Sequence, residues 1–339
     1  MKPIVLSAPA PRSLDLIFTA EKRTMLHDRY EIVETTDDDM ALLPGGTLGA
    51  ARYILGQPPI SEATLDQLKN LKAVLNVESN LIDNMPYQRV FERGIHVLTT
   101  GAVFAVPVAE MGLGLALDLA RGITTADLDF RSGAEKWGGD GNADARLLTG
   151  ADVGIIGYGD LGRALRKVLT GFNCAIKVHD PWLPPSILME DGVEPAALDV
   201  VISQSDFIFV VAAVTSENRH FLGAEAFAAM RRNARFILLS RAEVVDFEAM
   251  MDAVRAGKIY AASDVFPQEP LPLDHPVRDL PNFIRSAHRA GALDIAFQQM
   301  GDMVLEDMAL MDNDLPPMRC KRAERETVSR MRSKPVTHN

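Results

Sequence analysis

The feature that most constrains the fold is a series of short, largely apolar segments between residues 152 and 265. They read DVGIIG (152–157), AIKVHD (175–180), FIFVVAAV (207–214), ARFILLS (234–240) and IYAASDV (259–265). Strands this uniformly apolar are typical of a parallel sheet that is buried on both faces. Helical patterns separate them, over 160–172, 221–232 and 245–257. The alternation predicts an α/β unit with helices on both faces of its sheet.

The first hundred residues alternate in the same way, with shorter apolar runs: IVLSA, YEIVET, ARYILGQ and KAVLNVES. Between them SEATLDQLKNL predicts a helix with Ser61 as its N-cap. A chain of 339 residues is long enough for about two domains. Near the end, 292–311 is a further predicted helix, whose methionines (Met300, Met303, Met311) are expected in the core. The basic, polar segment from Cys320 onward predicts a loosely packed tail.

Charge and cysteine content exclude several classes of function. A net charge of −11 argues against non-specific binding to nucleic acid or to anionic membranes, because both require a basic surface. The longest apolar stretch, 102–122, is interrupted by Glu110 and Asp118, so a buried helix is expected there and not a membrane span. Two cysteines in so long a chain form no disulfide framework, which favours a reduced, cytoplasmic location. No metal site is predicted.

A glycine motif predicts a dinucleotide site. VGIIGYGDLGRAL places Gly157, Gly159 and Gly162 in G-x-G-x-x-G spacing, after an apolar strand and at the start of a helix. In that context the first glycine allows a tight turn, the second lets a pyrophosphate approach the backbone, and the third allows close helix–strand packing. The helix N-terminus offers unpaired N–H groups to the phosphates. A glycine turn that binds nothing is the alternative interpretation.

The next strand ends at Asp180, where a carboxylate would accept hydrogen bonds from the adenosine ribose hydroxyls. This position favours NAD over NADP, because the 2′-phosphate of NADP would meet a negative charge. Asp160 lies inside the glycine loop, so its side chain is expected to point outward, away from the phosphates.

Three later segments carry side chains suited to redox chemistry on a carbonyl. Arg241 follows the strand ILLS, at the sheet edge where doubly wound folds bind ligands, and its guanidinium can hold a carboxylate. SDVFPQEPLP carries Asp264 and Glu269, and RSAHRAG carries His288. Hydride transfer to a carbonyl requires a proton donor at the oxygen, a role that histidine fills near neutral pH. Taken singly, Arg241 could equally be a surface arginine, and a structural hydrogen bond is the more common interpretation of an isolated His–Glu pair.

Taken together, the order of these motifs resembles the D-isomer-specific 2-hydroxyacid dehydrogenase family. The order is the glycine loop, the strand-end aspartate, SRAxxVD, DVFxxEPLP and a histidine followed by small residues. The resemblance covers nearly the whole chain, since FERGIHVLTT and VPVAEMGLGLALDLARGI are similar to the family's approach to its interdomain helix. It implies two doubly wound α/β domains of Rossmann or flavodoxin type. The NAD-binding domain, 104–291, would be inserted into a substrate domain made of 1–103 and 292–339.

The resemblance also implies residue roles and a function. Arg241 would bind the substrate carboxylate and keto oxygen, and His288 would be the general acid/base with Glu269 as its partner. Asp264 would hold the nicotinamide carboxamide. The implied function is NAD-dependent interconversion of a small 2-hydroxy acid and its 2-oxo acid by a homodimer. The remaining predicted cofactor residues are Asp160, Leu161, Thr215, Leu239, Ser240 and Gly291.

The chain departs from the family where a glycine-rich loop usually binds the substrate carboxylate. The corresponding stretch reads NVESNLIDN, so Ser79 and Asn80 are the predicted substrate-binding residues there, with Glu78 beside them. Neither this stretch nor LGQPPIS (55–61) contains a lysine or arginine that could hold a phosphate, which favours an unphosphorylated substrate. The alternatives are D-3-phosphoglycerate dehydrogenase itself and a non-catalytic protein that binds NAD(H).

Overall fold

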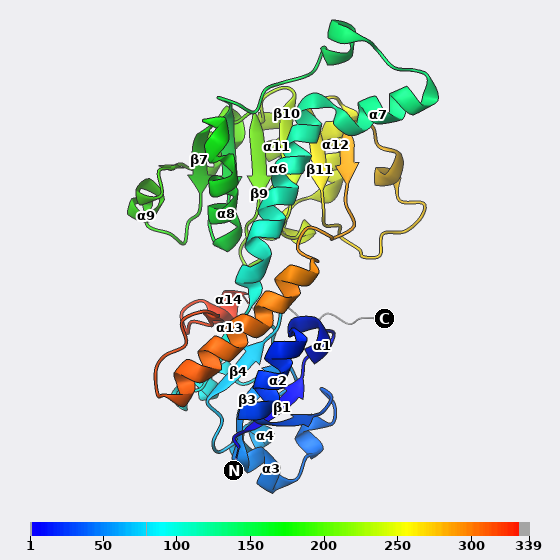
Figure 1. Cartoon of the computed structure of the whole chain (residues 1–339). Coiled ribbons are helices and arrows are strands. Elements are labelled where there is room, and N and C mark those ends of the chain that lie inside the picture. Colours follow the sequence, from blue (N-terminus) through cyan, green and yellow to red (C-terminus); the bar gives the residue numbers. More distant parts are fainter. Residues whose placement is uncertain (1, 79, 332–339) are drawn as a thin grey trace. The chain divides into compact units, whose positions relative to one another are not determined.

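The computed structural model describes residues 2–78 and 80–331. The chain divides into two compact units, which are described one at a time. The split unit consists of Met1–Val103 and Leu293–Asn339, and the inserted unit is Phe104–Ala292 (Figure 1). Both contain a twisted sheet between layers of helices, so the prediction of two doubly wound α/β domains is confirmed.

The inserted unit is built on a seven-stranded sheet in the order β12-β11-β10-β9-β6-β7-β8. All of its strand pairs are parallel. Its strands are β6 (Asp152–Ile156), β7 (Ala175–His179), β8 (Glu194–Pro195), β9 (Phe207–Val210), β10 (Ala234–Leu238), β11 (Ile259–Ser263) and β12 (Phe283–Arg285). The chain leaves β6 toward β7 and β8 and then returns to the other side of β6, which makes β6/β9 the topological switch point.

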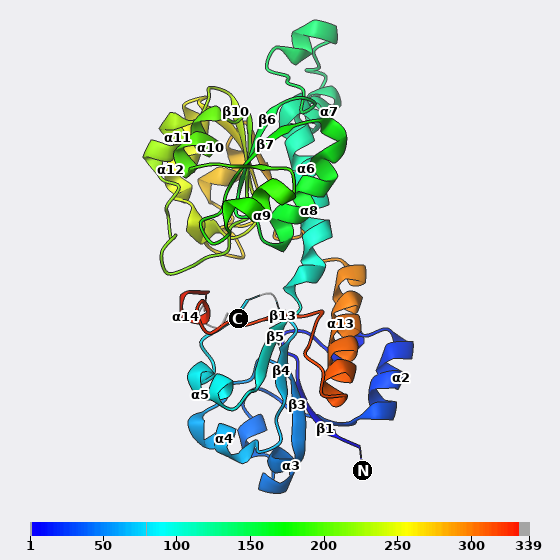
Figure 2. The ribbon, with the colours of Figure 1, turned by 90° about the vertical axis from the view of Figure 1, so that its left-hand side faces the viewer.

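Helices cover both faces of this sheet, as Figure 2 shows. On one face lie α6 (Ala105–Arg121) and α8 (Asp160–Leu169), and on the other lie α10 (Leu198–Gln204), α11 (Ala224–Ala229) and α12 (Phe247–Arg255). Each face has its own apolar core. Leu115, Leu165 and Ile155 belong to the first, and Phe236, Met250 and Ile208 belong to the second. Helix α9 (Pro185–Glu190) lies between β7 and β8 in the chain.

Within the described chain, Gly101–Arg121 is the one helical segment long and apolar enough to cross a membrane by length and composition. One face of α6, including Ala109, Gly112 and Ala116, is buried in the core it shares with α8. A side chain at Gly112 would lie 2.6 Å from Leu239 Cδ1, so α6 sits closely on the sheet. This burial accounts for the apolar composition of the segment.

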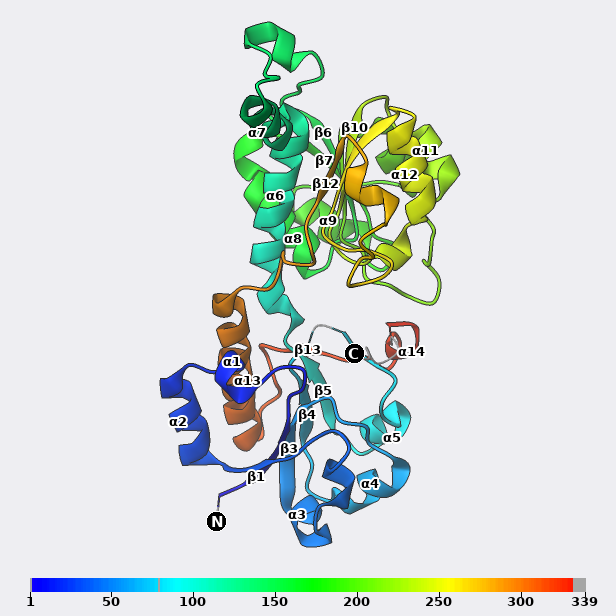
Figure 3. The same cartoon turned by 90° about the vertical axis from the view of Figure 1, so that its right-hand side faces the viewer.

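Helix α7 (Ile123–Ser132) has no buried residue. It follows α6 after Gly122 and projects from the rest of the inserted unit, together with the segment that leads to β6 (Figures 2 and 3). Its exposed apolar side chains include Ile123, Leu128 and Phe130, and Trp137 beyond it is 75% exposed.

The split unit has a six-stranded sheet in the order β13-β5-β4-β3-β1-β2. Its strands are β1 (Ile4–Ala8), β2 (Glu31–Glu34), β3 (Ala51–Gly56), β4 (Ala73–Asn76), β5 (His96–Thr99) and β13 (Lys321–Arg322). All pairs are parallel except β13–β5. Here the switch point lies between β1 and β3.

Two helical layers flank this sheet (Figure 3). One layer contains α1 (Leu14–Ile17), α2 (Ala20–Arg29) and α13 (Asp294–Asp312), and the other contains α3 (Gly45–Ala50), α4 (Glu62–Gln67) and α5 (Tyr87–Glu92). Ser61 caps α4 as predicted, since its Oγ accepts the Thr64 N–H. The predicted core methionines of α13 are all buried. In this way a segment from the end of the chain completes a domain that begins at residue 1.

The prediction of a loosely packed tail is wrong for the described part of the C-terminal segment. Strand β13 pairs with β5, and α14 (Val328–Met331) follows it. Cys320, Ala323 and Val328 are buried, the last two in the core beneath α4 and α5. These three apolar side chains, spaced through a basic sequence, outweighed its polar composition.

Candidate active site

The glycine loop lies at the switch point of the inserted unit, between β6 and α8. Gly157 has a φ of +91°, and a Cβ there would lie 2.5 Å from Ala212 Cα, on the chain that leaves β9. A Cβ on Gly162 would lie 2.5 Å from the Gly157 carbonyl oxygen. Both glycines are therefore required by the protein's own packing, as expected for the first and third positions of the motif.

The second glycine behaves differently. A Cβ on Gly159, the N-cap of α8, would meet no protein atom within 4 Å. That open space, in front of the unpaired N–H groups of a ten-residue helix, is what a pyrophosphate needs. Asp160 is exposed and Leu161 is half-buried in the first turn of α8. The residues present therefore fit a dinucleotide.

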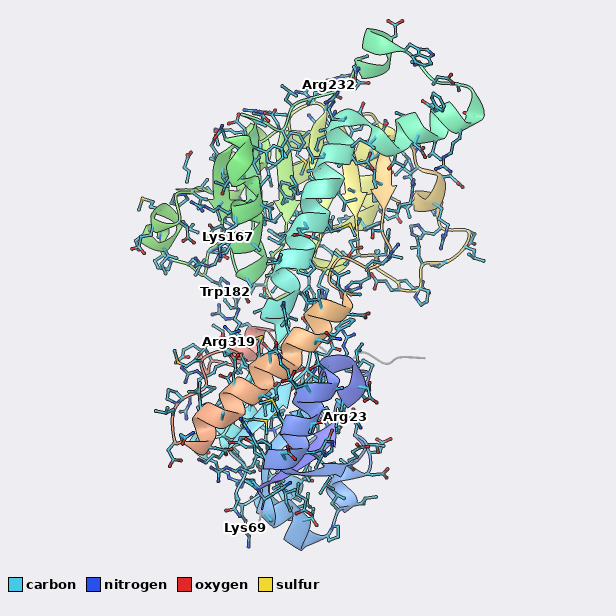
Figure 4. All side chains as sticks on the ribbon, viewed as in Figure 1. Arg23, Lys69, Lys167, Trp182, Arg232 and Arg319 are labelled. Carbon is cyan, nitrogen blue, oxygen red and sulfur yellow. The ribbon has the colours of Figure 1, made fainter. Side chains whose placement is uncertain are left out.

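Asp180, directly after β7, accepts two backbone hydrogen bonds. Its Oδ2 takes the Tyr158 N–H at 2.7 Å and its Oδ1 takes the Trp182 N–H at 2.9 Å. The carboxylate thus ties the glycine loop to the turn after β7, where the exposed Trp182 is labelled in Figure 4. Each oxygen keeps a lone pair that could accept a ribose hydroxyl.

The other predicted cofactor residues lie along the same sheet edge or pack behind it. Thr215 forms a turn after β9, donating its N–H to Asn218 Oδ1 at 2.7 Å and accepting the Glu217 N–H. Leu239 and Ser240 follow β10 and are buried, and the Ser240 hydroxyl has no hydrogen-bond partner among the described residues. A Cβ on Gly291 would lie 2.8 Å from the Phe104 ring, so this glycine permits close packing within the unit.

The two residues predicted to act as an acid/base pair contact each other. His288 Nδ1 lies 2.6 Å from Glu269 Oε2, and Glu269 Oε1 accepts the Phe266 N–H at 2.9 Å. Because Nδ1 is occupied by the carboxylate, the other ring nitrogen, Nε2, is the one left to exchange a proton with a substrate. The histidine side chain is 47% exposed. Arg241, in the turn after β10, donates to the Ser240 carbonyl at 2.7 Å.

Asp264 holds the histidine turn in place. Its buried carboxylate accepts the N–H groups of Arg289 at 2.9 Å and Ala290 at 3.0 Å, and its carbonyl accepts the His288 N–H at 2.7 Å. His288 itself has a φ of +50°, a left-handed conformation that is uncommon for a residue with a side chain. Such strain persists only where the surroundings enforce it. This bracing role was not predicted from the sequence, which shows only an aspartate before a histidine 24 positions later.

Opposing effects act on the pKa of Glu269. Burial raises it, but the hydrogen bonds from His288 and the Phe266 N–H, together with the nearby charges of His288 and Arg241, lower it by more. The net pKa lies below the ordinary glutamate value, so Glu269 is an anion at neutral pH and can orient the imidazole.

The predicted substrate-binding turn lies in the split unit, after β4. Ser79, one of the two predicted substrate-binding residues of this turn, lies outside the described residues. The buried Asn76 binds the described residues on either side of that position, since its Oδ1 accepts the Glu78 N–H at 2.7 Å and its Nδ2 donates to the Asn80 carbonyl at 2.7 Å. Asn76 was missed in the sequence, although an asparagine at a strand end is a recognised turn former.

Comparison with known proteins identifies the family. The family model described as "D-isomer specific 2-hydroxyacid dehydrogenase, NAD binding domain" matches residues 113–290. A glyoxylate reductase of Thermofilum pendens is 32% identical over 76% of this chain and 77% of its own length. A hydroxypyruvate reductase of Thermotoga maritima is 34% identical over 70% of this chain and 76% of its own length.

Among solved structures, a phosphoglycerate oxidoreductase from Rhizobium etli is 66% identical to this chain, with a TM-score of 0.89. The match covers 96% of this chain and 100% of the other. The family model, the two reductases and this structure agree with one another and confirm the resemblance that the motifs indicated. The chain therefore belongs to the D-isomer specific 2-hydroxyacid dehydrogenase family, and it is an oxidoreductase that acts on CH–OH groups with a nicotinamide dinucleotide, NAD or NADP.

Proposed function

We propose that this enzyme interconverts a small, unphosphorylated 2-hydroxy acid and its 2-oxo acid, with NAD preferred to NADP. The observation that carries the proposal is the His288–Glu269 pair, joined at 2.6 Å and held by Asp264. Glu269 follows β11, His288 follows β12, and Arg241 follows the neighbouring β10. The carboxyl ends of parallel strands form one edge of a sheet, and doubly wound folds bind their ligands there.

Each of the three side chains has a distinct role in the proposal. Arg241 binds the carboxylate and the keto oxygen of the oxo acid through its guanidinium. His288 gives a proton from Nε2 to that oxygen during reduction, and Nε2 takes a proton from the hydroxyl group during oxidation. Glu269 holds the imidazole by Nδ1 and so fixes the orientation of the ring. The nicotinamide ring, when bound, supplies or accepts the hydride.

The two units divide the work in this proposal. The inserted unit binds the dinucleotide through the glycine loop and Asp180, and the split unit contributes the turn that includes Asn80 to the substrate carboxylate. Asp264 contacts the nicotinamide carboxamide with the lone pairs that its backbone partners leave available. The preference for NAD follows from the negative charge of Asp180, which disfavours a 2′-phosphate.

A second candidate, oxidation of a phosphoglycerate, is favoured by one observation. The 66% identical protein from Rhizobium etli is named a phosphoglycerate oxidoreductase. Against it stands the absence of lysine and arginine from 55–61 and from the NVESNLIDN segment (76–84), where a phosphate clamp would be expected.

We also propose that the enzyme is a cytoplasmic homodimer. Helix α7, which has no buried residue, and the exposed apolar side chains of Ile123, Leu128, Phe130 and Trp137 form a surface that a second copy of the chain would cover. Both cysteines are free thiols, as a reducing compartment requires. Light scattering should give the mass of a dimer for the wild type and of a smaller species for a Phe130→Ser/Trp137→Ser variant. A monomeric wild type would contradict the homodimer.

The decisive experiment measures NADH oxidation with glyoxylate, hydroxypyruvate, pyruvate and phosphohydroxypyruvate, and repeats each with NADPH. Turnover of an unphosphorylated acid with NADH supports the main proposal. A strong preference for phosphohydroxypyruvate establishes the second candidate instead. Tight NADH binding without turnover of any 2-oxo acid would contradict both and support a role in binding NAD(H) alone.

A further inference from the structure

An arginine that is distant in sequence pairs with the predicted substrate-binding turn. Arg12 lies in the turn between β1 and α1, and its Nε and Nη2 reach the two oxygens of Glu78 at 2.8 and 3.3 Å. The Phe297 ring of α13 lies under the guanidinium, 4.5 Å from its carbon to the ring centroid. No local sequence pattern indicates this pair, because its members are 66 positions apart.

The pair is better enclosed than a typical surface ion pair. The Arg12 and Glu78 side chains are 23% and 25% exposed, whereas the carboxylates that pair with Arg23 and Lys72 in the same unit are 75% and 88% exposed. Nη2 donates a hydrogen bond to Oε2, whereas Nε approaches Oε1 closely without hydrogen-bond geometry. A planar guanidinium that lies over an aromatic ring while it pairs with a carboxylate is an arrangement that lysine cannot reproduce. Enclosure also reduces screening by solvent, so the charges act strongly on their surroundings.

Glu78 cannot move away from the turn easily. Its N–H is held by Asn76, whose side chain also holds the Asn80 carbonyl, so the backbone on both sides of the turn is fixed. In the proposed function this turn binds the substrate carboxylate, and the negative charge of a carboxylate fixed in the same turn would repel that anion. Some other group has to compensate for the charge of Glu78.

We propose that Arg12 is that group: a positioning residue that neutralises Glu78 and so allows the turn after β4 to bind a 2-oxo acid carboxylate. The role rests on the proposed function. Arg12 acts through Glu78 and is not assigned any contact with the substrate. The pair as a whole carries no net charge, which suits a substrate with one carboxylate and offers no surplus cation to a phosphate.

Three variants that change the charge of the Arg12–Glu78 pair test the proposal. Arg12→Gln leaves Glu78 uncompensated and should raise the KM of the oxo acid at least about tenfold, equivalent to about 1.4 kcal/mol, with little change in kcat. Glu78→Gln should leave that KM unchanged or lower it, and should improve the use of phosphohydroxypyruvate because it frees a cation. The Arg12→Gln/Glu78→Gln double variant should bring KM back to within about threefold of the wild type.

A purely structural role for Arg12 predicts different results. In that case Glu78→Gln and the double variant would be as impaired as Arg12→Gln, and the thermal stability of all three would fall together. Arg23→Gln is the matched control, since it removes an exposed arginine of the same unit. An Arg12→Gln variant with the KM of the wild type, or a double variant without recovery, overturns the proposal.

Calorimetric titration of oxamate, an anionic analogue of a 2-oxo acid, into NADH-loaded protein gives the same comparison without turnover. If the wild type binds oxamate but reduces no oxo acid, the proposed function fails while the role of Arg12 is still measured. Equal oxamate affinity in wild type and Arg12→Gln overturns the role of Arg12 alone. If the wild type binds no oxamate, both proposals fail.

Discussion

The two sheets of this protein have the same winding but offer different groups at their switch points. Each has a glycine of positive φ there: Gly157 beside Ala212 in the inserted unit, and Gly56 with a φ of +127° beside Ala8 in the split unit. After Gly157 comes a ten-residue helix with an open N-terminus. The loop beside Gly56 leads to the four-residue α1 and carries Arg12. One unit thus presents backbone N–H groups, and the other presents a compensated pair of charged side chains.

This difference between the two switch points indicates that the inserted unit carries the redox chemistry. An extended dinucleotide is bound by many backbone groups in fixed geometry, whereas a small acid is selected by a few charges. All three proposed catalytic side chains lie in the inserted unit. The split unit would then determine which acid is used and how tightly it binds, so variants in the two units should affect different kinetic constants.

The largest expected effect is the loss of His288. Without a proton donor, His288→Gln should lower kcat/KM by about 10²–10⁴-fold while the dissociation constant of NADH stays within about twofold. Stopped-flow turnover and fluorescence titration of NADH measure the two quantities. His220→Gln is the control, since His220 is an exposed histidine of the same unit that also has positive φ. A kcat/KM near that of the wild type in His288→Gln would show that the chemistry lies elsewhere.

The switch-point glycines should give the next largest effect, and it should be similar in the two units. Gly157→Ala and Gly56→Ala each force a side chain into positive φ and against backbone atoms, which should cost about 2–5 kcal/mol of unfolding free energy. Urea unfolding measures the loss. Gly171→Ala, exposed and with no atom near its Cβ, is the control.

Gly159→Ala separates stability from cofactor binding. Its Cβ meets no protein atom, so the unfolding free energy should stay within about 0.5 kcal/mol of the wild type while NADH binds more weakly. If Gly159→Ala were as destabilised as Gly157→Ala, the glycine would serve the fold and the open space would not be a phosphate site.

The sequence predicts the inserted unit better than the split unit. In the inserted unit, Gly157, Asp180, Arg241 and Asp264 each follow a predominantly apolar strand, so both the strand and the residue after it could be predicted from the sequence. The parallel sheet then brings these strand ends to one edge. The fold class was predictable for that reason, and the His288–Glu269 pair was expected from the resemblance of the motif order to a known family.

In the split unit the important contacts join segments far apart in the chain. Arg12 reaches Glu78, and the Asp312 carboxylate at the end of α13 accepts the Tyr30 and Tyr53 hydroxyls at 2.5 and 2.8 Å. Burial and these hydrogen bonds to Asp312 raise the pKa of both tyrosines. No local pattern encodes such pairs, since each partner looks like an ordinary surface residue in its own segment.

Cofactor choice tests a finer part of the comparison. Asp180→Asn keeps an oxygen acceptor after β7 but removes the charge, so the ratio of kcat/KM for NADH to that for NADPH should fall by about tenfold. The measurement is steady-state kinetics with each cofactor at a fixed, saturating oxo acid. Asp191→Asn, at the end of α9 in the same unit, is the control. An unchanged ratio would mean that backbone or other side chains set the preference.

The smallest effect concerns acid stability, and Glu269 determines its sign. Its pKa is lower in the folded protein than the ordinary glutamate value, so the ionised carboxylate stabilises the fold. That contribution is complete above the ordinary value and is lost as the pH falls through the lowered pKa. The Tm difference between wild type and Glu269→Gln should therefore be constant near pH 6 and shrink below about pH 4. Glu269 is 36% exposed, so solvent screening keeps the difference small.

Calorimetric scans from about pH 3 to 7, with Glu190→Gln as the control, measure this difference in Tm. A difference that grows on acidification would mean that Glu269 is destabilising as an anion, and the orienting role proposed for it would have to be abandoned.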